Sequence, residues 1–127
     1  MAGHLGVTGN KLVVDSKGDV VVDLKSDDID TRGIRANGGT IDVTAKKISV
    51  SVESKKQQAI GVEAWYGTSL TMTADQIEVT SKSETGPRVY GVQAQSEKEQ
   101  ANASKIEFNA DNINVNFSRT GTLGAQN

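Results

Sequence analysis

The chain contains no cysteine, which excludes disulfide bonds, thiol catalysis and thiolate metal sites. Proline occurs once, at Pro87, and aromatic residues make up only 4% of the 127 residues. Aromatic side chains usually carry much of the buried area of a globular core, so the interior here must be built from smaller side chains. There is no apolar run of about 18 residues, the length that a transmembrane helix needs.

A strongly charged surface of one sign is also absent. The formal net charge is −2, and the 14 basic and 16 acidic residues are interspersed, so no nucleic-acid partner is expected. Residues 1–10 lack a basic stretch followed by an apolar run, so no signal peptide is recognisable there, and residues 1–4 are interpreted as a leader. The single histidine, His4, falls in this leader, and no metal or other cofactor is expected.

What the sequence does contain is a repeat. Valine, isoleucine and threonine are plentiful and favour strands, and 13 glycines are spread along the chain, as expected between short strands. Glycine words of the form Gly-(Val/Ile)-x-Ala recur at 33–36, 61–64 and 91–94, with looser versions at 6–9 and 123–126. Their glycines are separated by about 27 to 33 residues, a spacing typical of solenoid repeats.

A second block follows each glycine word and reads apolar-x-apolar-x-Ala-x-x-Ile-x-Val, at 41–50, 70–79 and 106–115. Within each block apolar and polar residues alternate, which is the period of a β-strand, and the phase changes after the alanine. Each repeat therefore predicts three short strands. In the second full copy they are expected at about 60–64, 70–74 and 77–81, with residues 75 and 76 in the corner.

Three short strands cannot bury their apolar faces alone, but stacked coils can, at about 4.8 Å per coil. We therefore predict one all-β domain over residues 1–127, a right-handed parallel β-helix of about four coils. The coils are expected at 5–31, 32–59, 60–89 and 90–122, with 123–127 opening another. The predicted interior columns are Val7, Ile34, Val62 and Val92; Leu12, Ile41, Leu70 and Ile106; Val14, Val43, Met72 and Phe108; Ala45, Ala74 and Ala110; Ile48, Ile77 and Ile113; Val22, Val50, Val79 and Val115; Leu24, Val52, Ser81 and Phe117.

The stretches GGTIDVTAKKISVSVES and AIGVEAWYGTSLTMTADQIEVTSKS resemble the β-helical passenger domains of bacterial autotransporters and related large surface adhesins, which have a pectin-lyase-like β-solenoid fold. The resemblance covers residues 5–125 and rests on the character of the repeat rather than on a catalytic motif. It implies a secreted, surface-displayed segment with a signal peptide before the passenger, a membrane β-barrel after it, and a host surface protein or glycan as partner.

Enzymes with a β-helix of the pectate-lyase type need carboxylates clustered on adjacent coils, to hold Ca²⁺ or to act as acids. No predicted outward column places two carboxylates on adjacent coils, so no catalytic residue and no enzymatic activity are expected. Arg35 beside Glu63 is the clearest outward pair and is predicted to be a water-facing salt bridge worth roughly a few tenths of a kcal/mol. The acidic run of Asp23, Asp27, Asp28 and Asp30 favours surface charge on a loop over a Ca²⁺ site, because the spacing of calcium-binding loops is absent.

Two segments depart from the repeat, at 83–90 and 95–104, where the connections lengthen. A tolerated surface insertion is the simpler interpretation, and a binding loop is the alternative. Trp65 and Tyr66 lie on the same edge as the second insertion, where they either pack over the coil edge or contact a sugar or a partner. The candidate binding surface comprises Trp65, Tyr66, Gln95, Glu97, Lys98, Glu99 and Gln100.

Three functional hypotheses follow. The leading one is a non-catalytic structural or adhesive segment at the bacterial surface, with no membrane contact within this chain. The second is a polysaccharide-binding or polysaccharide-degrading domain of the pectate-lyase type. The third is a scaffold that assembles end to end, because neither end of the predicted stack has an obvious polar cap and open strand edges invite pairing.

Overall fold

The structure, a computed structural model, describes residues 5–8, 11–95 and 103–121. These residues form twelve strands and contain no helix, and therefore none that could cross a membrane. The strands are β1 (Leu5–Thr8), β2 (Lys11–Asp15), β3 (Asp19–Ser26), β4 (Thr31–Asn37), β5 (Thr40–Thr44), β6 (Lys47–Ser54), β7 (Ala59–Trp65), β8 (Ser69–Thr73), β9 (Gln76–Ser83), β10 (Val89–Gln95), β11 (Lys105–Asn109) and β12 (Asn112–Arg119).

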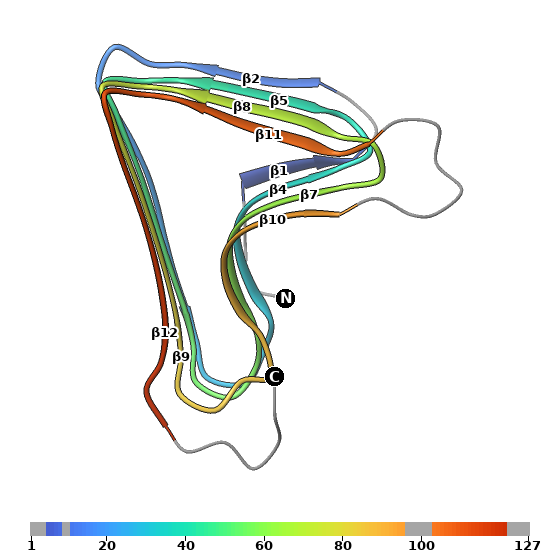
Figure 1. Ribbon diagram of the computed structural model, residues 1–127, viewed down its shortest axis with the longest axis vertical. Coiled ribbons are helices and arrows are strands. Elements are labelled where there is room, and N and C mark those ends of the chain that lie inside the picture. The colour runs from blue at the N-terminus through green and yellow to red at the C-terminus, as the bar shows by residue number, and fades with distance from the viewer. Residues whose placement is uncertain (1–4, 9–10, 96–102, 122–127) are drawn as a thin grey trace.

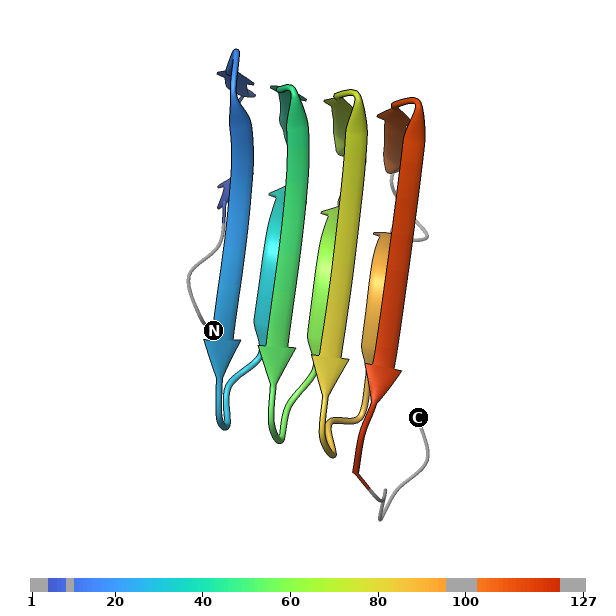
Figure 2. The same ribbon diagram turned by 90° about the vertical axis from the view of Figure 1, so that its left-hand side faces the viewer.

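The strands form three parallel four-stranded sheets in the orders β1-β4-β7-β10, β2-β5-β8-β11 and β3-β6-β9-β12. Viewed down the stack, the sheets are the three sides of an elongated triangle (Figure 1). Three consecutive strands make one coil, and the four coils lie side by side along the stack (Figure 2). The predicted all-β, parallel, solenoid-like stacking is thus confirmed.

The alternating sequence pattern explains which side chains form the core. β6 and β9 begin by alternating half-buried and buried residues, so that Ile48, Val50, Ile77 and Val79 point into the triangle. Ile41, Leu70 and Ile106 are in register, as are Val43, Met72 and Phe108. The corner alanines are in register too, since the Ala45 amide donates to the Thr73 carbonyl at 3.0 Å. These interior columns were correctly predicted.

One column needs correction. Val7 was predicted to stack on Ile34, but β1 pairs Leu5 with Ile34 and Val7 with Ala36. A shift of two residues leaves every strand residue on the same face, so the alternation of apolar residues cannot distinguish the two registers. The glycine word at 6–9 is consequently not equivalent to the one at 33–36, because Gly6 pairs with Arg35 rather than with Gly33.

The other glycine words mark a bend in the sheet formed by β1, β4, β7 and β10, which we call the first sheet. Its strands curve, whereas those of the other two sheets run nearly straight (Figure 1). At the bend the backbone touches the opposite sheet: a Cβ on Gly33, Gly61 or Gly91 would lie 2.4, 2.2 or 2.2 Å from a valine Cγ1 atom. Only a residue without a side chain allows this approach.

Candidate functional site

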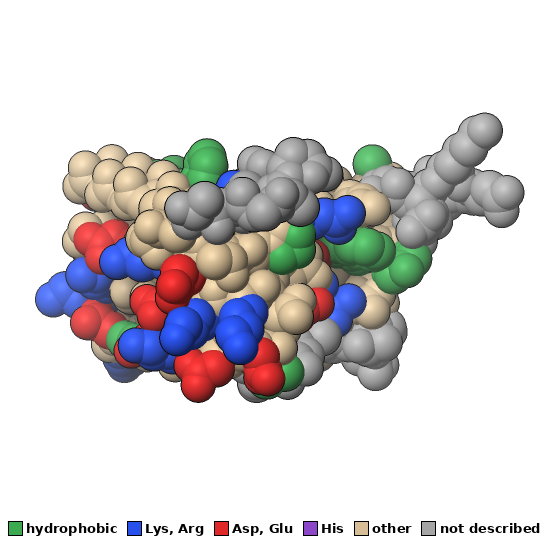
Figure 3. Space-filling model, turned by 90° about the horizontal axis from the view of Figure 1, so that it is seen from below, with side chains coloured by type: hydrophobic (Ala, Val, Ile, Leu, Met, Phe, Trp, Pro, Cys, Tyr) green, Lys and Arg blue, Asp and Glu red, His purple; other side chains and the backbone are tan. Residues whose placement is uncertain are grey.

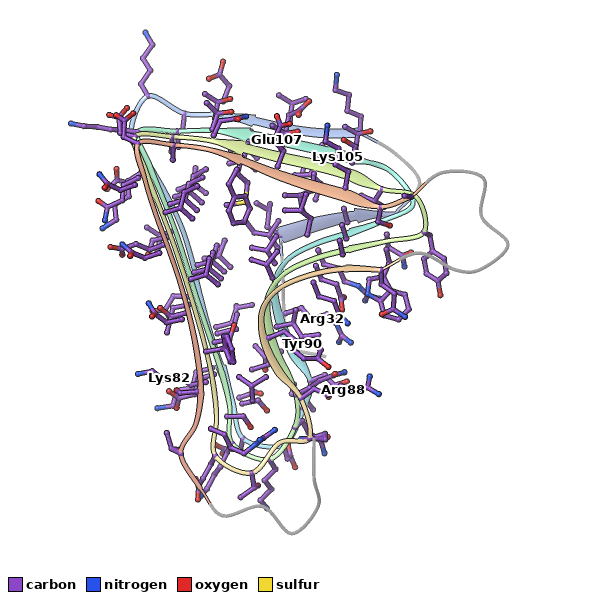
Figure 4. All side chains as sticks on the ribbon, viewed as in Figure 1. Arg32, Lys82, Arg88, Tyr90, Lys105 and Glu107 are labelled. Carbon is purple, nitrogen blue, oxygen red and sulfur yellow. The ribbon has the colours of Figure 1, made fainter. Side chains whose placement is uncertain are left out.

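The bend makes the outer side of the first sheet concave, and we call this side the concave face. Arg32, Ile60 and Tyr90 are in register just before the bend, and Arg35, Glu63 and Gln93 are in register just after it. Arg32 and Tyr90 lie on this outer side (Figure 4). Because the glycines at the bend face inward, side chains from both sides of it converge on the concave face.

Glu63 is the centre of this convergence. Its Oε1 atom lies 2.9 Å from Arg32 Nε and 3.1 Å from Arg35 Nε, and its side chain is only 1% exposed. The predicted Arg35–Glu63 pair therefore exists, but the prediction that it faces water was wrong. The physical reason is the bend, which turns an outward position into a sheltered one.

The ionic cluster continues toward the loop before β4. Arg32 Nη1 lies 3.7 Å from Asp30 Oδ2, and the Gln58 side-chain amide donates to the same oxygen at 2.8 Å. Two arginines thus face two carboxylates, of which Glu63 is buried and Asp30 is partly exposed. The second carboxylate oxygen of Glu63, Oε2, is buried without a hydrogen-bond partner, so the cluster retains an unused acceptor.

The predicted aromatic residues lie at the rim of the concave face. The Trp65 and Tyr66 rings are 5.4 Å apart between centroids and inclined by 57°. Trp65 is half-buried with its Nε1 atom buried and unpaired, whereas Tyr66 is 40% exposed on a turn with φ 58°. The Trp65 ring thus packs at the coil edge, whereas contact of Tyr66 with a sugar or a partner stays a prediction.

The coils on both sides hold this turn in place. The Thr68 hydroxyl accepts a hydrogen bond from the Gly38 amide at 2.6 Å and donates to the Trp65 carbonyl. The Ser104 hydroxyl accepts from the Gly67 amide at 3.1 Å and contacts the Gln95 carbonyl at 2.7 Å. Gln95 is in register with Trp65 and exposed, while the predicted residues Glu97, Lys98, Glu99 and Gln100 lie outside the described residues.

Among the residues that the structure describes, which include the whole acidic run, no group of three potential metal ligands occurs. Asp27 instead lines a surface cavity of about 470 Å³ together with lysines and glutamates of adjacent coils, including Lys25, Glu53, Lys55 and Glu84. Basic and acidic side chains alternate over this end of the triangle, seen from below (Figure 3). The loop charges are therefore largely balanced by neighbours.

The remaining outward columns carry isolated ion pairs. Lys47 lies 3.5 Å from Glu78, and Lys105 lies 3.5 Å from Glu107, both pairs being exposed or partly exposed. The pKa of Glu107 is lowered, first by a hydrogen bond from the Asn109 side chain and then by the positive charge of Lys105. In the described registers no two carboxylates are direct neighbours on adjacent coils, so the paired acids of a pectate-lyase-type centre do not occur there.

Sequence reasoning missed Arg32 and Tyr90. A signal was present, because Arg32, Ile60 and Tyr90 each directly precede the glycine of a glycine word. Their role depends on the bend, which the alternation of apolar residues does not reveal. No protein-family model, curated protein or solved structure matches this chain, so any function must be argued from the fold and its surfaces.

Proposed function

We propose that this chain is a segment of a right-handed parallel β-helix that serves as a non-catalytic structural and adhesive module at a bacterial surface. The observation that carries the proposal is the parallel, in-register pairing between adjacent coils, which repeats from one coil to the next. Eight residues of β6 pair with β9, five of β5 with β8 and six of β4 with β7, all in parallel. Such a stack is stiff along its axis and presents its side faces and loops to the surroundings.

Surface chemistry supports the non-catalytic part of the proposal. The described outward columns hold single carboxylates, each beside a lysine, arginine or neutral residue, rather than the pairs that acid–base or Ca²⁺-assisted polysaccharide cleavage requires. The resemblance to autotransporter passenger domains supports display outside the cell, with the concave face and loops as the contact surfaces for a host protein or glycan.

A lyase assay tests this proposal. We expect no release of unsaturated products from polygalacturonate, with or without added Ca²⁺, measured by ultraviolet absorbance against an active pectate lyase. Turnover that is lost in the double variant Asp27→Asn with Asp28→Asn would overturn the non-catalytic role. Turnover retained in that variant would also overturn it and would place the reaction elsewhere.

Polysaccharide binding on the concave face is the second candidate, and a specific observation favours it. Tyr66 and Tyr90 are 40% and 38% exposed, and the Trp65 ring lies beside that of Tyr66. Sugars combine apolar faces, which stack on aromatic rings, with hydroxyl groups that donate to carboxylates and accept from N–H groups. The exposed rings of Tyr66 and Tyr90 offer the first kind of contact, and the partly exposed Asp30 carboxylate offers the second.

A glycan array tests this candidate. We expect a glycan retained at the concave face to lose at least about tenfold in affinity in Tyr66→Ala, because tyrosine is enriched among binding hot spots, where truncation costs about 2 kcal/mol or more. Phe117→Ala is the matched control, since Phe117 is also an exposed aromatic residue but lies in β12. Equal losses in the two variants, or no retained glycan, would exclude binding at this face.

A further inference from the structure

Within the part of the chain that the structure describes, apolar side chains of the interior columns are partly exposed at the two ends of the stack. Among the described strands, β1, β2 and β3 have no neighbour at one end, and β10, β11 and β12 have none at the other. Val92 and Val115 are 37% and 39% exposed, whereas Val62 and Val79, in the same columns one coil earlier, are completely buried. Burial in a column thus depends on having a coil on each side.

We propose that the chain stacks head to tail on a second copy of itself, so that β10, β11 and β12 of one copy pair in parallel with β1, β2 and β3 of the next. The contact would repeat the geometry of the coil boundaries inside the chain. It would convert both exposed ends into interior in one step, and it would complete the hydrogen bonding of the open strand edges.

The outline of the coils favours this arrangement over a two-fold one. The sides of one coil are unequal, with strands of seven, five and eight residues in β4, β5 and β6, and only the first side is bent (Figure 1). A two-fold axis across the stack would turn this outline over and make the facing strands antiparallel. A shift along the axis keeps all three sides aligned, so only head-to-tail stacking continues every sheet.

The register of the contact follows from the columns within the chain. Extending them places Ile113, Val115 and Phe117 opposite Val20, Val22 and Leu24 of the second copy. Phe117 is 65% exposed at its end. At the opposite end, a surface cavity of about 520 Å³ is lined mainly by apolar residues, including Leu5, Val14, Val22 and Leu24. Apolar side chains therefore meet apolar side chains at these three interior positions of the sheet, and at the next interior position Arg119 stands opposite Ser26.

The outward positions are compatible with the same register. Extended in this way, Asn112 and Asn116 stand opposite Asp19 and Asp23, so amide groups face carboxylates as possible donors. Among the charged residues of these two edges, the only like-charge pair is Lys105 opposite Lys11, and both are exposed. Because each copy offers one end of each kind, the contact does not close and would generate a filament.

Sedimentation velocity over a range of concentrations tests the contact. We expect the wild-type chain to form species of increasing length as concentration rises. Phe117→Asp should weaken association by at least about 100-fold, because stacking would bury an unpaired charge. Ser118→Asp is the matched control on the adjacent position of the same strand, which faces outward opposite Lys25 and should still associate. A wild-type chain that stays a single species at every concentration would overturn the proposal.

Mixing variants tests the polarity of the contact. Leu24→Asp blocks the other end, so it and Phe117→Asp should each be monomeric alone, with the β-type circular dichroism spectrum retained. An equimolar mixture should form a dimer and stop there, because one intact end of each kind remains. Dimers formed by either variant alone, or a mixture that stays monomeric, would contradict head-to-tail stacking.

Introduced cysteines test the register, and the absence of natural cysteine makes the readout clean. Asn116→Cys combined with Asp23→Cys places two thiols on facing strands about 4.8 Å apart, within the span of a disulfide. Mild oxidation should give a ladder of covalent oligomers on a non-reducing gel. Asn116→Cys combined with Lys17→Cys is the control, because residue 17 precedes β3. Equal ladders from both pairs would refute the register. Loss of glycan binding would leave these results unchanged, since the substituted positions in β3, β12 and the segment before β3 lie outside the first sheet, which carries the concave face.

Discussion

Replacing Glu63 with alanine should lower the free energy of unfolding by about 3 to 5 kcal/mol, because it leaves two arginines without the buried carboxylate that both contact. The side chains of Arg32 and Arg35 are only 11% and 19% exposed, so water replaces little of the lost interaction. Urea denaturation followed by circular dichroism measures the change. Glu63→Gln keeps the shape of the side chain and removes only its charge. It should therefore lower the free energy of unfolding by less than Glu63→Ala does.

Glu78→Ala is the control for this prediction. Glu78 pairs with Lys47 at 3.5 Å on the outer side of a straight sheet, and both side chains are 38% exposed. Partly exposed ion pairs contribute about 1 kcal/mol or less, so this variant should stay close to wild type. If Glu63→Ala and Glu78→Ala cost the same, the Glu63 cluster is not a buried support of the bend.

Replacing Gly61 with alanine should destabilise the chain by about 3 kcal/mol, at the upper end of the usual cost of overpacking. The new Cβ would lie 2.2 Å from Val79 Cγ1 and 2.7 Å from the carbonyl oxygen of Gly91. The second contact is with backbone of the next coil, which cannot rotate away as a side chain can. The clash can therefore be removed only if the first sheet moves away from the sheet formed by β3, β6, β9 and β12.

Gly18→Ala is the matched control, because its Cβ would have only Ser16 Oγ nearby, at 4.0 Å. Its backbone is not among those with positive φ, so alanine meets no conformational barrier there. We expect a change within about 0.5 kcal/mol, measured in the same denaturation experiment. A similar loss in both variants would show that the cost comes from removing glycine flexibility and not from the close approach at the bend.

The strands and most columns could be predicted because two independent periodicities agree. Alternation sets which residues face inward, and the recurrence of the glycine word and the alanine corner sets which strand stacks on which. Where one of these is missing, the prediction fails: the first coil has no equivalent of Gly33 in β1, and its register was misplaced by two residues.

The environment of Glu63 could not be predicted for a different reason. Alternation assigns an outward position to solvent only if the sheet is flat or convex there. Close packing of Gly33 and Gly61 against valines of the facing sheet bends the first sheet inward and makes its outer side concave, so an outward glutamate becomes buried. The aromatic pair was predicted on the edge of the 95–104 insertion, and Trp65, the last residue of β7, is in register with Gln95 at the start of that insertion, while residues 96–102 lie outside the described residues.

The repeated register also has a consequence for how such a chain can change length. Each pair of adjacent coils is joined through the same columns of residues. One complete coil of three strands is therefore the smallest piece of sequence that can be duplicated or deleted without changing which residues of the other coils face inward. Growth would therefore occur in steps of about 4.8 Å rather than continuously. An insertion of a single residue within a strand would instead reverse the inward and outward positions of the residues after it in that strand, which favours the corners as sites of gradual variation.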